Sequence, residues 1–250
     1  MSVNNKRKAV ALLSGGLDST TSLYWARACG YDVVKAVGFN YGQLHKKELE
    51  SAQKIADKNG IPFVLIDLWK SGVTEALSNS ESSLISGDSA NIPEGHYAAS
   101  NMASTVVPLR NLMMASIASA IAEADGADVM VIGVHAGDHF VYPDCRPDFV
   151  RALDLAVSQG TEGKVSVIAP FLHYSKAIIA ETAIELGVPI ALTWSCYKGG
   201  ENHCGRCGTC VERAEAINEA AERLGLSDFA DPTHYDDATY WRTAIKNQED

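Results

Sequence analysis

A phosphate group could be held by the string Ser14-Gly15-Gly16-Leu17-Asp18-Ser19-Thr20. Two consecutive glycines allow a tight turn, and the backbone N–H groups freed by such a turn can point at an anion. The hydroxyls of Ser14 and Ser19 add donors, and the carboxylate of Asp18 can help to position Mg²⁺. The spacing is not that of a Walker A loop, and no G-x-G-x-x-G is present. A plain glycine turn is the alternative, but the complete string favours a phosphate-binding loop.

Four cysteines near the C-terminus follow the spacing C-x7-C-x2-C-x2-C, at Cys196, Cys204, Cys207 and Cys210. Thiolates are ligands that zinc accepts readily, and four of them complete a tetrahedral shell. Since no position is left for water, we expect a structural zinc site and not a catalytic one. Free or redox-active cysteines are the alternative, which a cluster of four makes less attractive.

The elements around the phosphate string alternate between short apolar segments and longer helical patterns. We expect an α/β fold with a Rossmann-like parallel sheet and helices on both faces. In this arrangement the phosphate string ends the first strand and opens the first helix, at the edge where open sheets bind ligands. The expected strands are 9–13, 33–39, 62–67, 129–134 and 165–169. The expected helices are 18–29, 43–59, 111–125, 148–159, 175–186, and one from 207 or 209 to 224.

Two segments depart from this alternation. Residues 71–106 are rich in Ser, Asn, Gly and Ala, which predicts a loop-dominated excursion near the site. From residue 195 onward the cysteine-rich stretch begins. We therefore divide the chain into a nucleotide-binding α/β domain, 1–194, and a small zinc-binding and helical C-terminal region, 195–250.

Composition excludes several classes of protein. The chain of 250 residues carries a net charge of −10 and no basic stripe, which argues against a nucleic-acid partner. No apolar run approaches the roughly 20 residues that span a bilayer, and the polar N-terminus lacks the core of a signal peptide. We expect a cytoplasmic protein without a membrane partner, where clustered cysteines hold a metal more often than disulfides.

Beyond these arguments, the string from Ser14 to Ser19 resembles the signature of the PP-loop ATP pyrophosphatase superfamily. Further strings, together with the cysteine quartet, resemble the family of 7-cyano-7-deazaguanine synthases in the right order along most of the chain. They are FNYGQLH from Phe39, VPLRN from Val107, and GDHFVYPDCRP from Gly137.

This resemblance implies a reaction of queuosine biosynthesis. ATP would adenylate the carboxylate of 7-carboxy-7-deazaguanine, and ammonia would displace AMP to leave the amide. A second ATP would activate the amide oxygen, and loss of AMP would leave the nitrile. ATP, Mg²⁺ and structural Zn²⁺ are the implied cofactors, and a homodimer is the implied assembly. The source of the ammonia stays open.

Both adenylation steps need stabilisation of charge on phosphate, which a nearby cation can supply. Arg110 and Lys176 are the candidates, joining Asp18 and Ser19 as catalytic residues. The loop after the strand at 129–134 would hold the deazaguanine. In it we expect substrate contacts from Asp138, Tyr142, Asp144 and Arg146.

Three further residues of the same stretch are left without an assigned role. His135 and His139 are four apart, but the segment between them lacks helical character, so substrate contacts or plain loop positions are preferred to a second metal site. We expect Cys145 to pack, because direct adenylation needs no covalent intermediate.

Two other functions remain open. A PP-loop ligase that joins the activated deazaguanine carboxylate to a different amine would share every motif. A non-catalytic, zinc-stabilised nucleotide-binding module would also carry the loop and the cysteines. The product formed with ammonia as the only amine separates the first from the synthase, and an absence of AMP formation would indicate the second.

Overall fold

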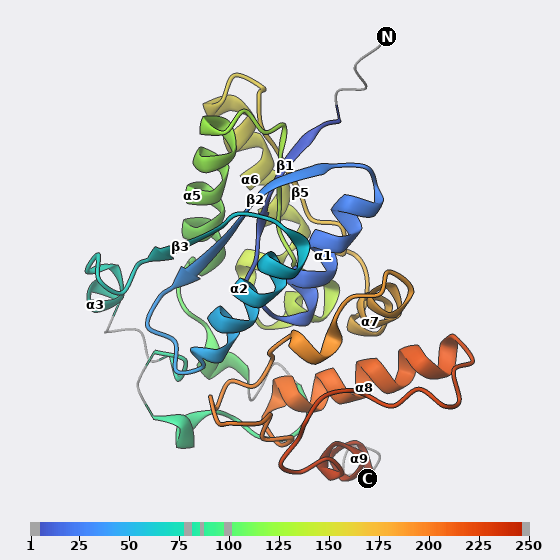
Figure 1. The fold of residues 1–250 in the computed structure, drawn as a ribbon. Helices are drawn as coiled ribbons and strands as arrows, with labels where there is room; N and C mark the ends of the chain where they lie inside the picture. The colour runs from blue at the N-terminus through green and yellow to red at the C-terminus, as the bar shows by residue number, and fades with distance from the viewer. Residues whose placement is uncertain (1–5, 78–81, 86–87, 98–101, 247–250) are drawn as a thin grey trace.

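A parallel sheet of five strands forms the centre of the computed structural model, in the order β3-β2-β1-β4-β5 (Figure 1). The structure describes residues 6–77, 82–85, 88–97 and 102–246. The strands are β1 (Lys8–Leu12), β2 (Asp32–Asn40), β3 (Phe63–Asp67), β4 (Val129–Val131) and β5 (Ser166–Ile168). The α/β class and the parallel sheet expected from the sequence are confirmed.

Helices cover both faces of the sheet, because the central strand β1 is apolar on both sides. Ala9 and Ala11 pack beneath helices α1 (Leu17–Ala28) and α2 (Lys47–Asn59). Val10 and Leu12 face the opposite layer, formed by α5 (Arg110–Ala124) and α6 (Pro147–Gly160). A strand buried on both faces reads as a continuous apolar run, as this one does.

The strand order reverses direction at β1, which places a crevice between β1 and β4. The chain runs outward from β1 to β2 and β3, and then returns to the other side for β4 and β5. Ligands of open α/β sheets bind in such a crevice, at the carboxyl ends of the strands. The phosphate string leaves β1 at this point.

Residues 71–106 form a loop-dominated excursion in their described parts. They contain the short helix α3 (Val73–Ala76) and two 3-10 turns, η1 (Ser89–Asn91) and η2 (Ala103–Thr105). Positions 78–81, 86–87 and 98–101 of this segment lie outside the described residues.

The second helix begins later than the predicted position 43. Gln43 is buried, and its side chain accepts a hydrogen bond from the Tyr41 N–H and donates one to the Phe39 carbonyl. These bonds hold the chain in a turn after β2, so helix geometry starts only at Lys47. The sequence pattern alone could not separate a buried polar turn from the first turn of an amphipathic helix.

The C-terminal part extends the helical layer on the α1 side. Helix α7 (Lys176–Glu185) has Ser175 at its N-cap position, although that side chain makes no capping hydrogen bond. The turn η5 (Ile190–Leu192) follows, then α8 (Gly208–Arg223) and the unpredicted helix α9 (Tyr240–Lys246). Figure 1 shows α8 and α9 beneath the sheet. A hydrophobic cluster joins α1, α7 and α8, so the packing crosses the predicted boundary at 194/195.

One helical segment, Ala103–Ala124, is long and apolar enough to cross a membrane, with a mean hydropathy of 1.3. It contains α5, which packs on β1 and β4 and buries Met114, Ala115 and Ala118 in the core. Core helices pass the same length and composition test, so this finding carries little weight for a membrane span.

Candidate active site and metal centre

The phosphate string forms a tight loop between β1 and α1. Gly15 has φ +90, and a Cβ there would lie 2.1 Å from the carbonyl oxygen of Glu48, so only glycine fits. The hydroxyls of Ser14 and Ser19 lie 3.0 Å apart, and the Ser14 N–H donates to Ser19 Oγ. The loop therefore brings two hydroxyls and the N-terminus of α1 to one place, as an anion site requires.

A second close approach fixes the position of α1 against the sheet. A Cβ on Gly133, just after β4, would lie 2.8 Å from the backbone of Ser19. The end of β4 and the first turn of α1 thus touch through their backbones. This contact places the residues that follow β4 directly beside the phosphate loop.

Lys176, at the start of α7, lies over the loop and pairs with two carboxylates. Its Nζ is 2.5 Å from Asp18 Oδ2 and 3.6 Å from Glu212 Oε2. Burial alone would lower the pKa of Lys176, but the two carboxylates raise it above its ordinary range. Burial likewise opposes ionisation of Asp18, yet Lys176 and His135 hold its pKa below the usual value. Lys176 is therefore a charged ammonium beside a charged carboxylate.

His135 and Asp138 continue this cluster from the loop after β4. His135 Nδ1 accepts a hydrogen bond from the Gly137 N–H at 3.1 Å, so Nε2 faces the acids. Nε2 is 3.5 Å from Asp138 Oδ2 and 4.0 Å from Asp18 Oδ2. The other oxygen of Asp138 accepts a hydrogen bond from the Tyr97 hydroxyl at 3.0 Å. His135 thus links the phosphate loop to the loop predicted to bind substrate.

Arg110 opens helix α5 and is enclosed by tyrosines. Its guanidinium carbon lies 5.6 Å from the ring centre of Tyr41 and 5.5 Å from that of Tyr142, within cation–π range. Nη1 donates to the Tyr41 hydroxyl at 3.2 Å. Among the described residues, no carboxylate forms an ion pair with this guanidinium. An arginine held by aromatic faces and lacking a carboxylate partner suits an anionic ligand.

Tyr142 lines the same pocket, with its hydroxyl 2.7 Å from Thr105 Oγ1. Asp144 and Arg146 do not line it. Asp144 is buried, and its carboxylate accepts a hydrogen bond from the Asn111 N–H in the first turn of α5. Arg146 is exposed, and its Nε donates to the carbonyl of His139. These two residues hold the loop and the helix in place, one layer away from the cavity.

Cys145 also lines the cavity, and it is buried. Burial raises the pKa of its thiol, and Asp138 adds to this effect. Asn111 Nδ2 donates to Sγ at 3.1 Å. A protonated thiol is a poor nucleophile, which agrees with the packing role expected from the sequence.

The cavity has two chemically different ends above an apolar floor. Its phosphate end contains Ser14, Asp18, Ser19, Lys176 and Glu212. Its aromatic end contains Tyr41, Tyr97, Arg110, Tyr142 and Tyr197. The floor includes Leu12, Phe39, Ile132 and Val134, from the ends of three neighbouring strands. The space can accept a planar ring beside a polyanion.

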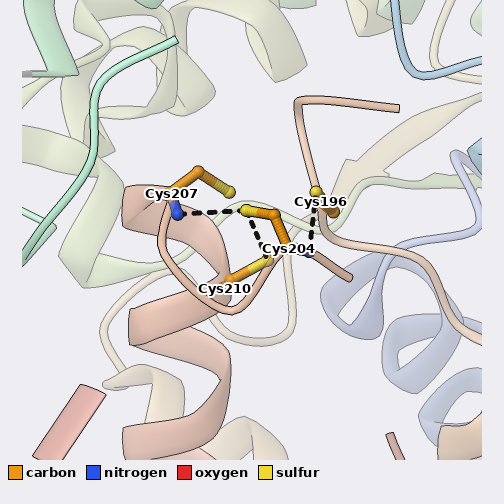
Figure 2. A group of neighbouring side chains, drawn as sticks. All are labelled: Cys196, Cys204, Cys207 and Cys210. Carbon is orange, nitrogen blue, oxygen red and sulfur yellow. Dashed lines mark hydrogen bonds between the residues drawn. The ribbon is translucent and has the colours of Figure 1, made fainter. Parts of the chain in front are cut away.

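The four cysteines converge on one point, with their sulfurs within 4.8 Å of one another. Figure 2 shows Cys207 and Cys210 at the start of α8, with Cys204 and Cys196 on the preceding loop. The Sγ atoms of Cys204 and Cys210 are 3.9 Å apart. The N–H groups of Arg206 and Cys207 donate to Cys204 Sγ, an arrangement that favours a thiolate. These four cysteines could hold a metal ion, and among the described residues they are the group found with this capacity.

The cysteine-rich region, 195–250, supplies three residues to the cavity that the sequence did not predict, namely Tyr197, Thr209 and Glu212. Glu212 stands two positions after the last cysteine on a helix otherwise rich in alanine. Glu212 lies on the same helix face as buried Thr209 and Ala216, and a charged residue on that face is the signal that could have identified it. Tyr97 was missed as well, since nothing local distinguishes it within the excursion.

The sequence of this chain is similar to known proteins over nearly its whole length. A family model described as queuosine biosynthesis protein QueC matches residues 8–221. The 7-cyano-7-deazaguanine synthase of Brucella anthropi is 44% identical over 243 residues, covering 96% of this chain and 99% of that protein. The synthase of Ruegeria pomeroyi is also 44% identical, covering 96% of this chain and 100% of that protein. Among solved structures, the U34-tRNA thiolase NcsA from Methanococcus maripaludis has a TM-score of 0.46 at 14% identity, covering 99% of this chain and 73% of that one.

Proposed function

The chain belongs to the QueC family of queuosine biosynthesis proteins, and we propose that it is an ATP-dependent 7-cyano-7-deazaguanine synthase. Its substrates in this proposal are 7-carboxy-7-deazaguanine, ammonia and two molecules of ATP. The carboxylate is adenylated and converted to the amide, and the amide is then adenylated and converted to the nitrile. The observation that carries the proposal is a single cavity in which a phosphate loop faces an arginine enclosed by tyrosines.

At the phosphate end, this chain binds the triphosphate and neutralises its charge. The N-terminus of α1 and the hydroxyls of Ser14 and Ser19 donate to phosphate oxygens. The ammonium of Lys176 lies beside them and offsets charge as the bond between the α- and β-phosphates breaks. Gly15, Gly16, Leu17 and Thr20 complete the loop.

The residues of this end fit a magnesium ion. Asp18 Oδ1 is buried and accepts no hydrogen bond from a described residue, while Oδ2 is occupied by Lys176. An oxygen left in this state beside a phosphate site suits a hard cation. When bound, Mg²⁺ would offset the negative charge of the phosphate oxygens.

At the aromatic end, this chain binds and orients the deazaguanine. The ring of Tyr142 stacks on the base, and Asp138 accepts hydrogen bonds from its N–H groups. Arg110 pairs with the carboxylate and directs it toward the phosphate end. Asp144 and Arg146 form the outer layer of the same loop, and in this proposal they act on the substrate by holding that loop.

The four cysteines hold structural Zn²⁺. A tetrahedral zinc site with Zn–S bonds of about 2.3 Å places its sulfurs about 3.8 Å apart. The separation between Cys204 and Cys210 is close to that value. Four sulfurs leave no position for a water molecule or substrate, so the ion would stabilise the fold and take no part in the chemistry.

We also propose a cytoplasmic homodimer that uses free ammonia or ammonia from a separate donor. The family resemblance supports the assembly, and the reduced thiols suit a reducing compartment.

Mass spectrometry of the product tests the function. The protein is incubated with 7-carboxy-7-deazaguanine, ATP, Mg²⁺ and ¹⁵N-labelled ammonium, and AMP is counted. A labelled nitrile with two AMP per turnover supports the synthase. An adenylate that reacts only when another amine is supplied indicates the alternative ligase, and no AMP with any substrate indicates a binding module.

A further inference from the structure

His45 is a histidine of the cavity that the proposed function does not yet use. It lies in the turn between β2 and α2, inside the FNYGQLH string, and is 1% exposed. It lines the cavity that holds the phosphate loop, and its ring lies tilted against Tyr197 with centroids 4.9 Å apart. The imidazole therefore belongs to the wall that a bound substrate would contact.

The ring nitrogens of His45 lack hydrogen-bond partners among the described residues. Nε2 lies 3.1 Å from Glu48 Oε2, which is ion-pair distance without hydrogen-bond alignment. Buried polar groups almost always have partners, and each exception requires an explanation. A ligand in the cavity is the explanation that the position of this side chain offers.

Glu48 is fixed between His45 and the phosphate loop. Its Oε1 accepts a hydrogen bond from Gln43 Nε2 at 3.0 Å, which leaves Oε2 facing the imidazole. Its backbone carbonyl abuts Gly15, and its side chain lines the hollows on both sides of the phosphate loop. A carboxylate beside a histidine orients the ring, as in other acid–base pairs.

The proposed reaction has a requirement that the other residues of the cavity do not meet. Conversion of ammonia into a nitrile nitrogen removes all three N–H protons. Lys176 and Arg110 are cations and cannot accept a proton. Asp18 and Glu212 both pair with Lys176, and Asp138 is assigned to the N–H groups of the base. We propose that His45 accepts protons from the substrate nitrogen and that Glu48 positions the imidazole of His45. This inference rests on the proposed function.

Three N–H protons leave the substrate nitrogen over the two halves of the reaction, one in the first half and two in the second. Ammonia attacks the acyl carbon, the C–N bond forms, the C–O bond to AMP breaks with its electron pair, and one N–H proton passes to His45. The amide oxygen then attacks the α-phosphorus of the second ATP and displaces diphosphate. Two further N–H protons leave in turn, the second as the C–O bond to AMP breaks and the C≡N bond forms. No electrons are gained or lost, and each proton leaves for solvent before the next transfer.

The test compares His45→Gln with the wild-type protein in three assays that use the full chain, ATP and Mg²⁺. These are ATP–diphosphate exchange with the acid, amide formation with ammonium, and nitrile formation from the amide. Exchange involves no N–H proton, so we expect it within about threefold of wild type. Amide formation releases one N–H proton and nitrile formation releases two, so both should fall, and nitrile formation should fall more, by about 100-fold or more, since general base catalysis contributes that much. The ratio of nitrile to amide should therefore fall. Glu48→Gln should lower nitrile formation about 10-fold, because the imidazole remains.

The matched control is His96→Gln, which removes another histidine–glutamate pair that does not line the cavity. It should leave the ratio of amide to nitrile unchanged. If His45→Gln fails to fold, His45→Ala with added imidazole replaces it, and rescue of nitrile formation is expected. An unchanged ratio, an equal loss of exchange, or no rescue would each overturn the proposal. A wild-type protein that forms no nitrile would remove the proposed function as well, whereas nitrile from both proteins removes this proposal alone.

Discussion

The phosphate loop and the cysteine-rich region, 195–250, face each other across one cavity, but they are built in opposite ways. The loop is local, because its turn, hydroxyls and helix N-terminus all come from residues 14–20. The facing wall is assembled from Tyr197, Thr209 and Glu212, which lie nearly 200 positions farther along the chain. One side of this site is therefore encoded by a single local motif, whereas the other side comes from a region whose four cysteines could hold a metal ion.

Loss of the proposed metal cross-link between the four cysteines should have the largest effect on stability. Cys207→Ser removes one of the four cysteines proposed to hold zinc, and apparent zinc-binding energies of about 10–16 kcal/mol rival the whole stability of a domain. We expect loss of bound metal and a collapse of soluble yield, measured by metal analysis and thermal denaturation. Cys29→Ser, at an exposed cysteine outside the cluster, is the control and should behave as wild type. A stable, metal-free and active Cys207 variant would show that the facing wall needs no cross-link.

Damage to the local half should leave the fold and remove the chemistry. Asp18→Asn keeps the volume of the side chain but removes the charge that faces Lys176 and the proposed magnesium site. We expect AMP release to fall about 1000-fold, or about 4 kcal/mol in the barrier, with little change in melting temperature. Asp57→Asn, on the exposed side of α2, is the control. AMP release that survives in Asp18→Asn would separate the loop from the reaction.

Arg110 tests whether the two halves serve different parts of the substrate. Arg110→Lys keeps a positive charge but loses the planar group held between Tyr41 and Tyr142. We expect kcat/KM for the deazaguanine acid to fall about 10- to 100-fold, while the KM for ATP changes little. Steady-state kinetics with each substrate varied measures the split, with Arg151→Lys on α6 as the control. An equal change in both substrates would assign Arg110 to the phosphates.

The smallest expected effect on stability concerns the ion pairs between the cysteine-rich region, 195–250, and the excursion at 71–106. Glu94 accepts hydrogen bonds from Lys198 at 2.5 Å and from Arg206 at 3.1 Å, and the Gly95 N–H donates to the Arg206 carbonyl. The bond with Lys198 lowers the pKa of Glu94 below its ordinary value. A depressed acid pKa stabilises the fold above the unfolded-state pKa, and this contribution disappears as pH falls through the folded value.

Glu94→Gln should therefore lower the free energy of unfolding at neutral pH by less than about 1 kcal/mol, because the pair is partly exposed, and the melting temperature should fall slightly. The difference from wild type should vanish in acid, once Glu94 is protonated in the wild-type protein. Glu222→Gln, on the exposed face of α8, is the control for the loss of one charge. A difference that persists in acid would mean that packing, and not charge, holds the excursion.

The same contrast explains what could be predicted from the sequence. Periodicity located the strands and most helices, and the string from Ser14 to Ser19 placed a phosphate site at the carboxyl end of β1. Arg110 and Lys176 were expected near phosphate, and both line the cavity. Lys176 pairs with Asp18 of the loop, whereas Arg110 lies against Tyr41 and Tyr142, so their catalytic roles stay predictions. The residue types sufficed here because helix termini and strand ends are local properties.

The features of the site that could not be predicted depend on contacts between distant segments. Tyr97 reaches Asp138 across 41 positions, and no feature of its own neighbourhood indicates that contact. Asp144 and Arg146 were expected to contact substrate, whereas their side chains contact α5 and the His139 carbonyl. Within a polar loop of this kind, the sequence cannot tell which side chains face the cavity and which hold the loop, so their substrate roles stay predictions.

The hydrophobic cluster that joins α1, α7 and α8 limits how this protein can be divided. Leu17 begins α1 directly beneath the phosphate loop, and it packs in the same cluster as Ile179 and Ile217. A fragment that ends at Trp194 would expose the α1 and α7 sides of that cluster to water, and the complementary fragment would expose α8. We expect that neither fragment, 1–194 or 195–250, folds when it is expressed alone. Activity should return only when the two fragments are folded together. Helix α8 therefore shares one hydrophobic core with α1 and α7, although it follows position 194 in the sequence.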